Sequence, residues 1–209
     1  ASLANTHLFW HPMADHIRAI QAFAVVKKID EIRRGHYVGE KNTSPDPFLL
    51  CGDLNSDPLS GVCKLLTTRS IASDHHDCWN YLHEYKWDVD DTDVESMVES
   101  GKTAEERRSS HKNRQETSTA SAKTHPPSIA LPDSFPHIVS GCQPNPPFTN
   151  FTPQYMDTLD YVLASQPSEK EKFGFSPKRS APMPSVEDVK KFVSMVSVLV
   201  FVFVLLLLT

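Results

Sequence analysis

Glycine and cysteine are both scarce in this 209-residue chain, which has seven glycines and four cysteines against sixteen prolines. The cysteines form no CxxC pair, so the chain has neither a zinc-ribbon pattern nor the cysteine density of a small secreted disulfide scaffold. Positive charge is not in excess either. The net charge of −5 excludes a protein that binds nucleic acid through a simple basic surface. It does not exclude a protein that binds phosphate through metal ions.

A signal or transit peptide is also missing from the first residues, and the chain begins with Ala1 rather than Met. We therefore expect a chain that is cut at its N-terminus, inside a domain. Few cysteines and no leader favour an intracellular compartment, which could be the cytoplasm, the nucleus or the mitochondrion.

The order of the apolar patterns predicts a mixed fold, α/β or α+β. Residues 2–10 are typical of a short buried strand, and apolar residues at helical spacing predict a helix over 14–34. The short apolar runs 48–51 and 159–164 have the length and the polar flanks of buried strands. Ser60 is placed to cap a short helix that follows it.

Composition divides the chain into four parts. Residues 1–87 and 134–191 carry the predicted elements, and we expect them to form one domain. Residues 88–133 are acidic at first and then rich in Lys, Arg, Ser and Thr, which predicts a disordered insertion. The apolar tail, 192–209, is too long for one core strand and close to the lower limit of about 17–25 residues for a membrane-spanning helix. Its low-complexity sequence favours an aberrant terminus, produced by a retained intron or a shifted reading frame, over a membrane anchor.

Two acidic residues stand at the edges of predicted strands, Asp53 after 48–51 and Asp160 within 159–164. Asp53 and Asn55 are two residues apart, so on an extended segment their side chains face the same side. A carboxylate there can accept a proton from water while an amide orients the water or a phosphate. The same residues are also typical of an Asx turn at a strand end, which is the favoured interpretation without further context.

Four segments in this order resemble motifs of the endonuclease/exonuclease/phosphatase superfamily: 5–12 (NTHLFWHP), 17–21 (IRAIQ), 51–61 (CGDLNSDPLSG) and 149–162 (TNF, then LDYV). The resemblance covers about 3–80 and 138–192, and it is most specific for the 2′-phosphodiesterases of the deadenylase-like branch. It implies an α/β four-layer sandwich of which this chain is an incomplete half. It also implies Mg²⁺-dependent hydrolysis of phosphodiesters at the ends of RNA or oligoadenylate.

The resemblance implies a role for each of four matching residues. His7 would stabilise the charge on the phosphate, and Asp53 would act as general base or orient the attacking water. Asn55 would contact the scissile phosphate, and Asp160 would support the catalytic centre near the metal. Without its Asn-Thr context, His7 alone is more typical of a strand-end histidine with an ordinary structural role.

Pro12 and Tyr155 match positions that lie against the terminal base in this branch. An aromatic ring offers a stacking surface that any base can use. Loop packing explains Tyr155 about equally well. We expect Trp10 and His11 to be structural.

Two groups that the resemblance requires find no match. One is a metal-binding glutamate from an early strand, since Glu31 and Glu40 have the wrong context; Asp53 and Asp160 remain possible metal ligands. The other is a terminal Ser-Asp-His motif. A Ser-Asp-His sequence does occur at 73–75, but it lies in the wrong place along the chain, and we interpret it as structural. We therefore expect this chain to be inactive as a fragment.

Several alternatives stay open. The chain could instead be a tail-anchored, catalytically dead nucleotide-binding protein. Other substrates of the superfamily are abasic DNA, inositol phosphates and sphingomyelin, although the motif wording favours RNA ends and we see no DNA-binding module. The sequence does not distinguish 2′–5′ from 3′–5′ linkages, and it does not give the oligomeric state.

Overall fold

The computed structural model describes most of the two regions that carry the predicted elements. The described residues are 1–35, 45–75, 78–79, 81–82, 128–142, 145–152, 155–168, 173–180, 182–192, 198–199 and 204–208. All structural statements below concern these residues.

A mixed four-stranded sheet of order β1-β2-β8-β5 forms the centre of the fold. The strands β1 (Ser2–His7) and β2 (Phe48–Asp53) are parallel, while β8 (Asp160–Ser165) is antiparallel to both β2 and the edge strand β5 (Ile138–Ser140). Segments more than a hundred residues apart in sequence therefore hydrogen-bond side by side. The mixed α/β fold that the sequence predicts is confirmed.

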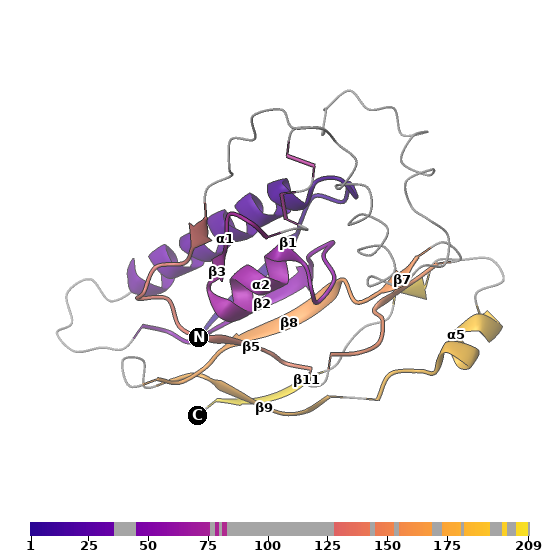
Figure 1. The fold of residues 1–209 in the computed structure, drawn as a ribbon. Helices are drawn as coiled ribbons and strands as arrows, with labels where there is room; N and C mark the ends of the chain where they lie inside the picture. The colour runs from indigo at the N-terminus through magenta and orange to yellow at the C-terminus, as the bar shows by residue number, and fades with distance from the viewer. Residues whose placement is uncertain are drawn as a thin grey trace.

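Helices α1 (Asp15–Gly35) and α2 (Gly61–Thr68) lie against the same side of this sheet (Figure 1). The helix predicted over 14–34 is confirmed as α1, which has Asp15 in its first turn and Arg33 in its last, as the helix dipole favours. Ser60 caps α2 as predicted, because its Oγ accepts a hydrogen bond from the Cys63 N–H at 3.3 Å.

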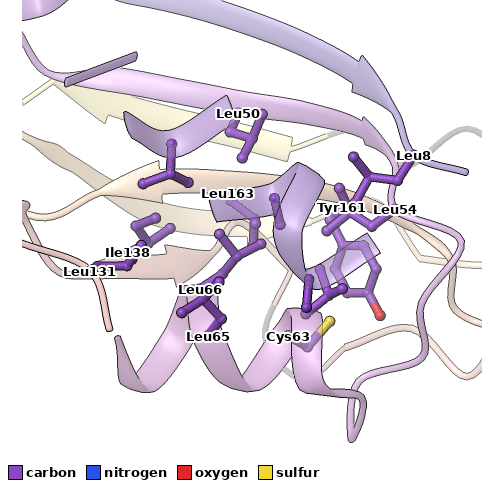
Figure 2. Packing of buried hydrophobic residues seen from close by; sticks show 14 of the residues in the cluster. Leu8, Leu50, Leu54, Cys63, Leu65, Leu66, Leu131, Ile138, Tyr161 and Leu163 are labelled. Atoms are coloured by element: carbon purple, nitrogen blue, oxygen red, sulfur yellow. The ribbon is translucent and has the colours of Figure 1, made fainter. Parts of the chain in front are cut away.

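The main core lies between the two helices and the sheet. Figure 2 shows Leu65 and Leu66 of α2 on the side of that helix that faces Leu163 of β8. Arg33 ties the end of α1 to the start of β2: its guanidinium is fully buried, lies 5.5 Å from the centre of the Phe48 ring, and donates through Nε to the Asp46 carbonyl at 2.9 Å. A packed layer of apolar side chains thus fills the space between the two helices and the sheet.

Smaller elements surround this core. Two short pairs and one three-stranded group are formed by β3 (Ser70–Ile71) with β4 (Ile129–Ala130), β9 (Phe175–Ser180) with β11 (Val204–Leu208), and β6 (Asn150–Phe151) between β7 (Met156–Asp157) and β10 (Val198–Leu199). The remaining helix is α5 (Val186–Phe192).

The predicted insertion, 88–133, is too long at its C-terminal end. Strand β4 lies inside it, the Leu131 N–H donates to the Arg69 carbonyl at 2.8 Å, and Leu131 is only 5% exposed in the main core. Pairing of β4 with β3 and burial of Leu131 in the main core order this part of the segment. Residues 88–127 of the prediction lie outside the described residues.

The strand predicted over 2–10 is shorter than expected and ends at His7. The described parts of the tail, 192–209, belong to α5, β10 and β11, so the tail is divided between elements rather than being one long strand. Of the residues that the structure describes, none belongs to a helix with both the length and the apolar character needed to cross a membrane.

Candidate active site

Three polar side chains stand in a row across the sheet edge where β1 and β2 end and β8 begins. His7 is the register partner of Asp53, and Asp53 is the register partner of Asp160. Because neighbouring strands lie about 5 Å apart, the row places His7 and Asp160 about 10 Å from each other with Asp53 between them. We call these three residues the acidic row.

His7 and Asp53 form the exposed half of the acidic row. His7 Nε2 lies 3.7 Å from Asp53 Oδ2, with the His7 side chain 71% exposed and the Asp53 side chain 23% exposed. An ion pair this open contributes little to stability. Both groups are accessible to a ligand from solution.

Asn55 joins the acidic row through a turn. The Asn55 N–H donates to Asp53 Oδ1 at 2.7 Å, and Asn55 Nδ2 donates to the Leu8 carbonyl at 2.7 Å. Asn55 has a φ of 46°, in the left-handed region, so the expectation of an extended segment here is wrong. The Asx turn that the sequence offered as the alternative to a functional role is present, and it is what brings Asn55 beside Asp53.

Gly52 explains how β1 and β2 approach so closely before Asp53. Its φ is 132°, and a Cβ at this position would collide with the Thr6 carbonyl oxygen and come within 2.9 Å of the Asn5 side-chain oxygen. Only glycine adopts this backbone conformation without strain. Gly52, the glycine of the GDLN motif, therefore sets the position of the Asp53 carboxylate that follows it.

Asp160 forms the other end of the acidic row and is half-buried. Burial raises the pKa of its carboxyl group, a hydrogen bond from the Thr149 side chain opposes that rise, the negative charge of Asp53 adds to it, and His7 lowers it. Two carboxyl groups on neighbouring strands repel each other when both are charged. This arrangement favours the binding of a cation or a proton between them.

Tyr161 connects β8 to the loop that carries Asn55, and the sequence did not identify it as a functional residue. Its hydroxyl donates to the Ser56 carbonyl at 2.8 Å, and the Thr158 carbonyl lies 3.0 Å away. Burial raises the pKa of the phenol, so Tyr161 stays a neutral donor. Figure 2 shows its ring in the core close to Leu54. The position of this tyrosine in the sequence, directly after the aspartate that begins β8, is the feature that could have identified it.

The predicted base-binding residues lie in two loops. Pro12 follows β1 and is half-buried, and Tyr155 stands in the turn between β6 and β7, where its N–H donates to Thr152 Oγ1 at 2.9 Å. Contact of either residue with a base stays a prediction. Of the two residues expected to be structural, His11 is buried whereas Trp10 is 51% exposed.

The donor atoms of the acidic row fit only part of a magnesium site. Asp53, Asp160 and the amide oxygen of Asn55 are hard oxygen donors, which Mg²⁺ prefers. Within the ranges that the structure describes, however, no group of three His, Cys, Asp or Glu side chains is placed to share one ion. Glu31 is exposed on α1 and pairs with Lys28 at 3.1 Å, and Glu40 lies outside the described residues.

The Ser-Asp-His sequence at residues 73–75 lies in a turn after β3. The His75 N–H donates to the Ala72 carbonyl at 3.2 Å, and His75 Nδ1 accepts from the Cys78 N–H at 3.3 Å. These contacts support the interpretation of His75 as a structural residue.

Comparison with known proteins gives the same family as the motifs. The sequence pattern of the Endonuclease/Exonuclease/phosphatase family matches residues 23–181, well over half of the chain. The 2′,5′-phosphodiesterase 12 of Mus musculus is 40% identical over 75 residues, which are 36% of this chain and 11% of that protein. The CCR4-Not complex 3′-5′-exoribonuclease subunit Ccr4 of Kluyveromyces lactis is 24% identical over 168 residues, which are 79% of this chain and 16% of that protein.

Among solved structures, the chain is similar to ANGEL2, described as a 2′,3′-cyclic phosphatase in complex with adenosine-2′,3′-vanadate. The TM-score is 0.52 at 16% sequence identity, and the match covers 90% of this chain and 50% of the ANGEL2 chain. At this identity the likeness shows the fold. The chain thus matches a small part of the length of both curated relatives and half of the length of ANGEL2.

Proposed function

The chain belongs to the endonuclease/exonuclease/phosphatase family, and from that premise we propose that it is part of a hydrolase that cleaves phosphodiesters at the ends of RNA or oligoadenylate. The observation that carries the proposal is the acidic row with Asn55 beside it. Four side chains of the types that phosphodiester hydrolysis requires lie at one sheet edge, although they are up to about 150 residues apart in sequence.

Each side chain has a geometry that suits its proposed role. Asp53 uses Oδ1 in the Asx turn, which leaves Oδ2 to accept a proton from water or to orient it. His7, when protonated, can donate to a phosphoryl oxygen, since its side chain is open to solvent and is held beside a carboxylate. Asn55 Nδ2 gives one hydrogen to Leu8, and the second is available for the scissile phosphate.

We assign Mg²⁺ as the cofactor, with Asp53 and Asp160 as the ligands that this chain would supply. When bound, the ion would neutralise charge on the phosphoryl oxygens. The described residues do not complete its ligand set, so a further acidic ligand has to come from elsewhere in the protein. For the same reason we propose that the 209-residue chain alone turns over orders of magnitude more slowly than a complete relative, since such groups act as a unit.

The activities of the similar proteins favour a ribonucleotide substrate. A 2′,5′-phosphodiesterase, a 3′-5′-exoribonuclease and a 2′,3′-cyclic phosphatase share phosphate esters at the ribose 2′ or 3′ oxygen. Inositol phosphates and sphingomyelin have no such group, and abasic DNA carries its 3′ phosphate ester on a deoxyribose that has no 2′ oxygen. We therefore propose RNA or oligoadenylate as the substrate, with either a 2′–5′ or a 3′–5′ linkage.

The test is an assay of the full-length native protein on 2′,5′- and 3′,5′-linked oligoadenylate with Mg²⁺. We predict that Asp53→Asn lowers kcat by about 10²–10⁴-fold, because the amide keeps the turn but is not a base. Asp57→Asn is the matched control, since Asp57 lies in the same loop and accepts the Leu59 N–H at 2.8 Å; it should keep kcat within about threefold.

Two results would contradict the proposal. Equal activity of Asp53→Asn and wild type would show that the acidic row does no chemistry. Tight binding of oligoadenylate without any hydrolysis by the wild-type protein would instead favour the catalytically dead nucleotide-binding protein.

A further inference from the structure

Thr149 is a fully buried polar residue whose hydroxyl oxygen accepts two hydrogen bonds from the backbone that leads into Asp160. The N–H groups of Leu159 and Asp160 both lie 2.9 Å from Thr149 Oγ1. Neither bond belongs to the ladder of β8, because both stand where that strand begins. The threonine therefore holds the entry of β8 from outside the main sheet.

Both lone pairs of the Thr149 hydroxyl oxygen are used. A hydroxyl has one hydrogen and two lone pairs. Both lone pairs accept the backbone N–H groups of Leu159 and Asp160. One side chain thus holds two successive backbone N–H groups at the point where the chain enters Asp160.

Thr149 is itself held in place by its neighbours. Its N–H donates to the Asp157 carbonyl at 3.0 Å, and the next residue along, Asn150, pairs with Asp157 in the β6–β7 ladder. On the other side, the buried Phe148 packs against Phe151 with 5.5 Å between ring centres. The hydroxyl oxygen is therefore part of a rigid support, which a positioning group requires.

We propose that Thr149 is a positioning residue of the acidic row, which fixes the backbone of Asp160, and with it the place of the Asp160 side chain opposite Asp53, and acts on the reaction through Asp160. The inference rests on the proposed function for its effect on turnover, but its structural half stands on the hydrogen bonds alone. Thr149 is set back from the substrate, because it is fully buried while His7 and Asp53 are accessible. Its loss should therefore change kcat rather than KM.

The test compares Thr149→Val, which keeps the shape and removes the hydroxyl, with Thr149→Ser, which keeps the hydroxyl. In the full-length native protein we expect Thr149→Val to lower kcat on oligoadenylate at least tenfold with KM within about twofold, and Thr149→Ser to restore kcat to within about threefold of wild type. Amide hydrogen exchange should show faster exchange at Leu159 and Asp160 in Thr149→Val only. If the valine variant does not fold, Thr149→Cys gives the same comparison, because a thiol is a weak acceptor.

Thr158→Val is the matched control, since Thr158 is also buried but its hydroxyl donates to the Pro146 carbonyl, whereas the Thr149 hydroxyl accepts from the Asp160 N–H. It should leave kcat within about twofold of wild type. Wild-type kcat in Thr149→Val, or equal loss in the valine and serine variants, would overturn the inference. A wild-type protein that hydrolyses nothing would remove the proposed function; unchanged amide exchange in Thr149→Val would then overturn the inference separately, and faster exchange confined to Leu159 and Asp160 would support it.

Discussion

At the scale of single residues, the loop after β2 is held by backbone contacts as much as by its own side chains. Tyr161 reaches from β8 to the Ser56 carbonyl, 105 residues away in sequence. The Ser56 hydroxyl, in contrast, is buried and has no hydrogen-bond partner among the described residues. One residue therefore supports the loop through its carbonyl while its side chain is a small cost to stability.

We predict opposite effects for two substitutions at this contact. Tyr161→Phe should lower the free energy of unfolding by about 1–3 kcal/mol, because the buried Ser56 carbonyl loses its donor. Ser56→Ala should leave it unchanged or raise it slightly, because an unsatisfied buried hydroxyl is removed. Urea unfolding of both variants measures the difference. A destabilisation by Ser56→Ala as large as that by Tyr161→Phe would show that the hydroxyl, not the phenol, supports the loop.

At the scale of elements, the contact between β1 and β2 depends on Gly52. The parallel pair brings His7 beside Asp53, and the backbone of Gly52 makes room for the Thr6 carbonyl. The geometry of the acidic row is therefore a property of how two strands pair, as well as of the residues that end them.

We predict that Gly52→Ala lowers the free energy of unfolding by at least about 2 kcal/mol, because the new Cβ collides with backbone and the positive φ becomes strained. Gly35→Ala is the control at the end of α1, where a Cβ would meet no atom within 4 Å; it should be neutral or mildly stabilising. Thermal unfolding of the two variants checks this. Equal stability of both would mean that the two strands separate at little cost.

The elements with strong local patterns could be predicted from the sequence. Helix α1 follows from apolar residues at helical spacing, and α2 from the Ser60 cap, while β2 and β8 follow from short apolar runs. Strand β4 could not be predicted, because the segment is ordered by long-range contacts: its pairing with β3 and the burial of Leu131 in the main core. The composition of the surrounding residues pointed the other way.

At the scale of the whole molecule, the candidate residues could be predicted but not the contacts that place them. The sequence motifs indicated four candidate site residues, His7, Asp53, Asn55 and Asp160. The Asn55 side chain donates to the Leu8 carbonyl, 47 residues away, and the supports of Asp160 and Ser56 come from hydroxyls that only the folded chain brings near. A pattern read along the chain does not contain these long-range partners.

The most direct test of the central claim is a crystal structure of the full-length protein with adenosine monophosphate, a product expected from the cleavage of oligoadenylate. We predict that the phosphate lies over the acidic row, with oxygens about 3 Å from His7 Nε2 and Asn55 Nδ2. A phosphate bound elsewhere while the acidic row stays empty would contradict the account. So would a structure that places His7 and Asp160 on opposite faces of the sheet.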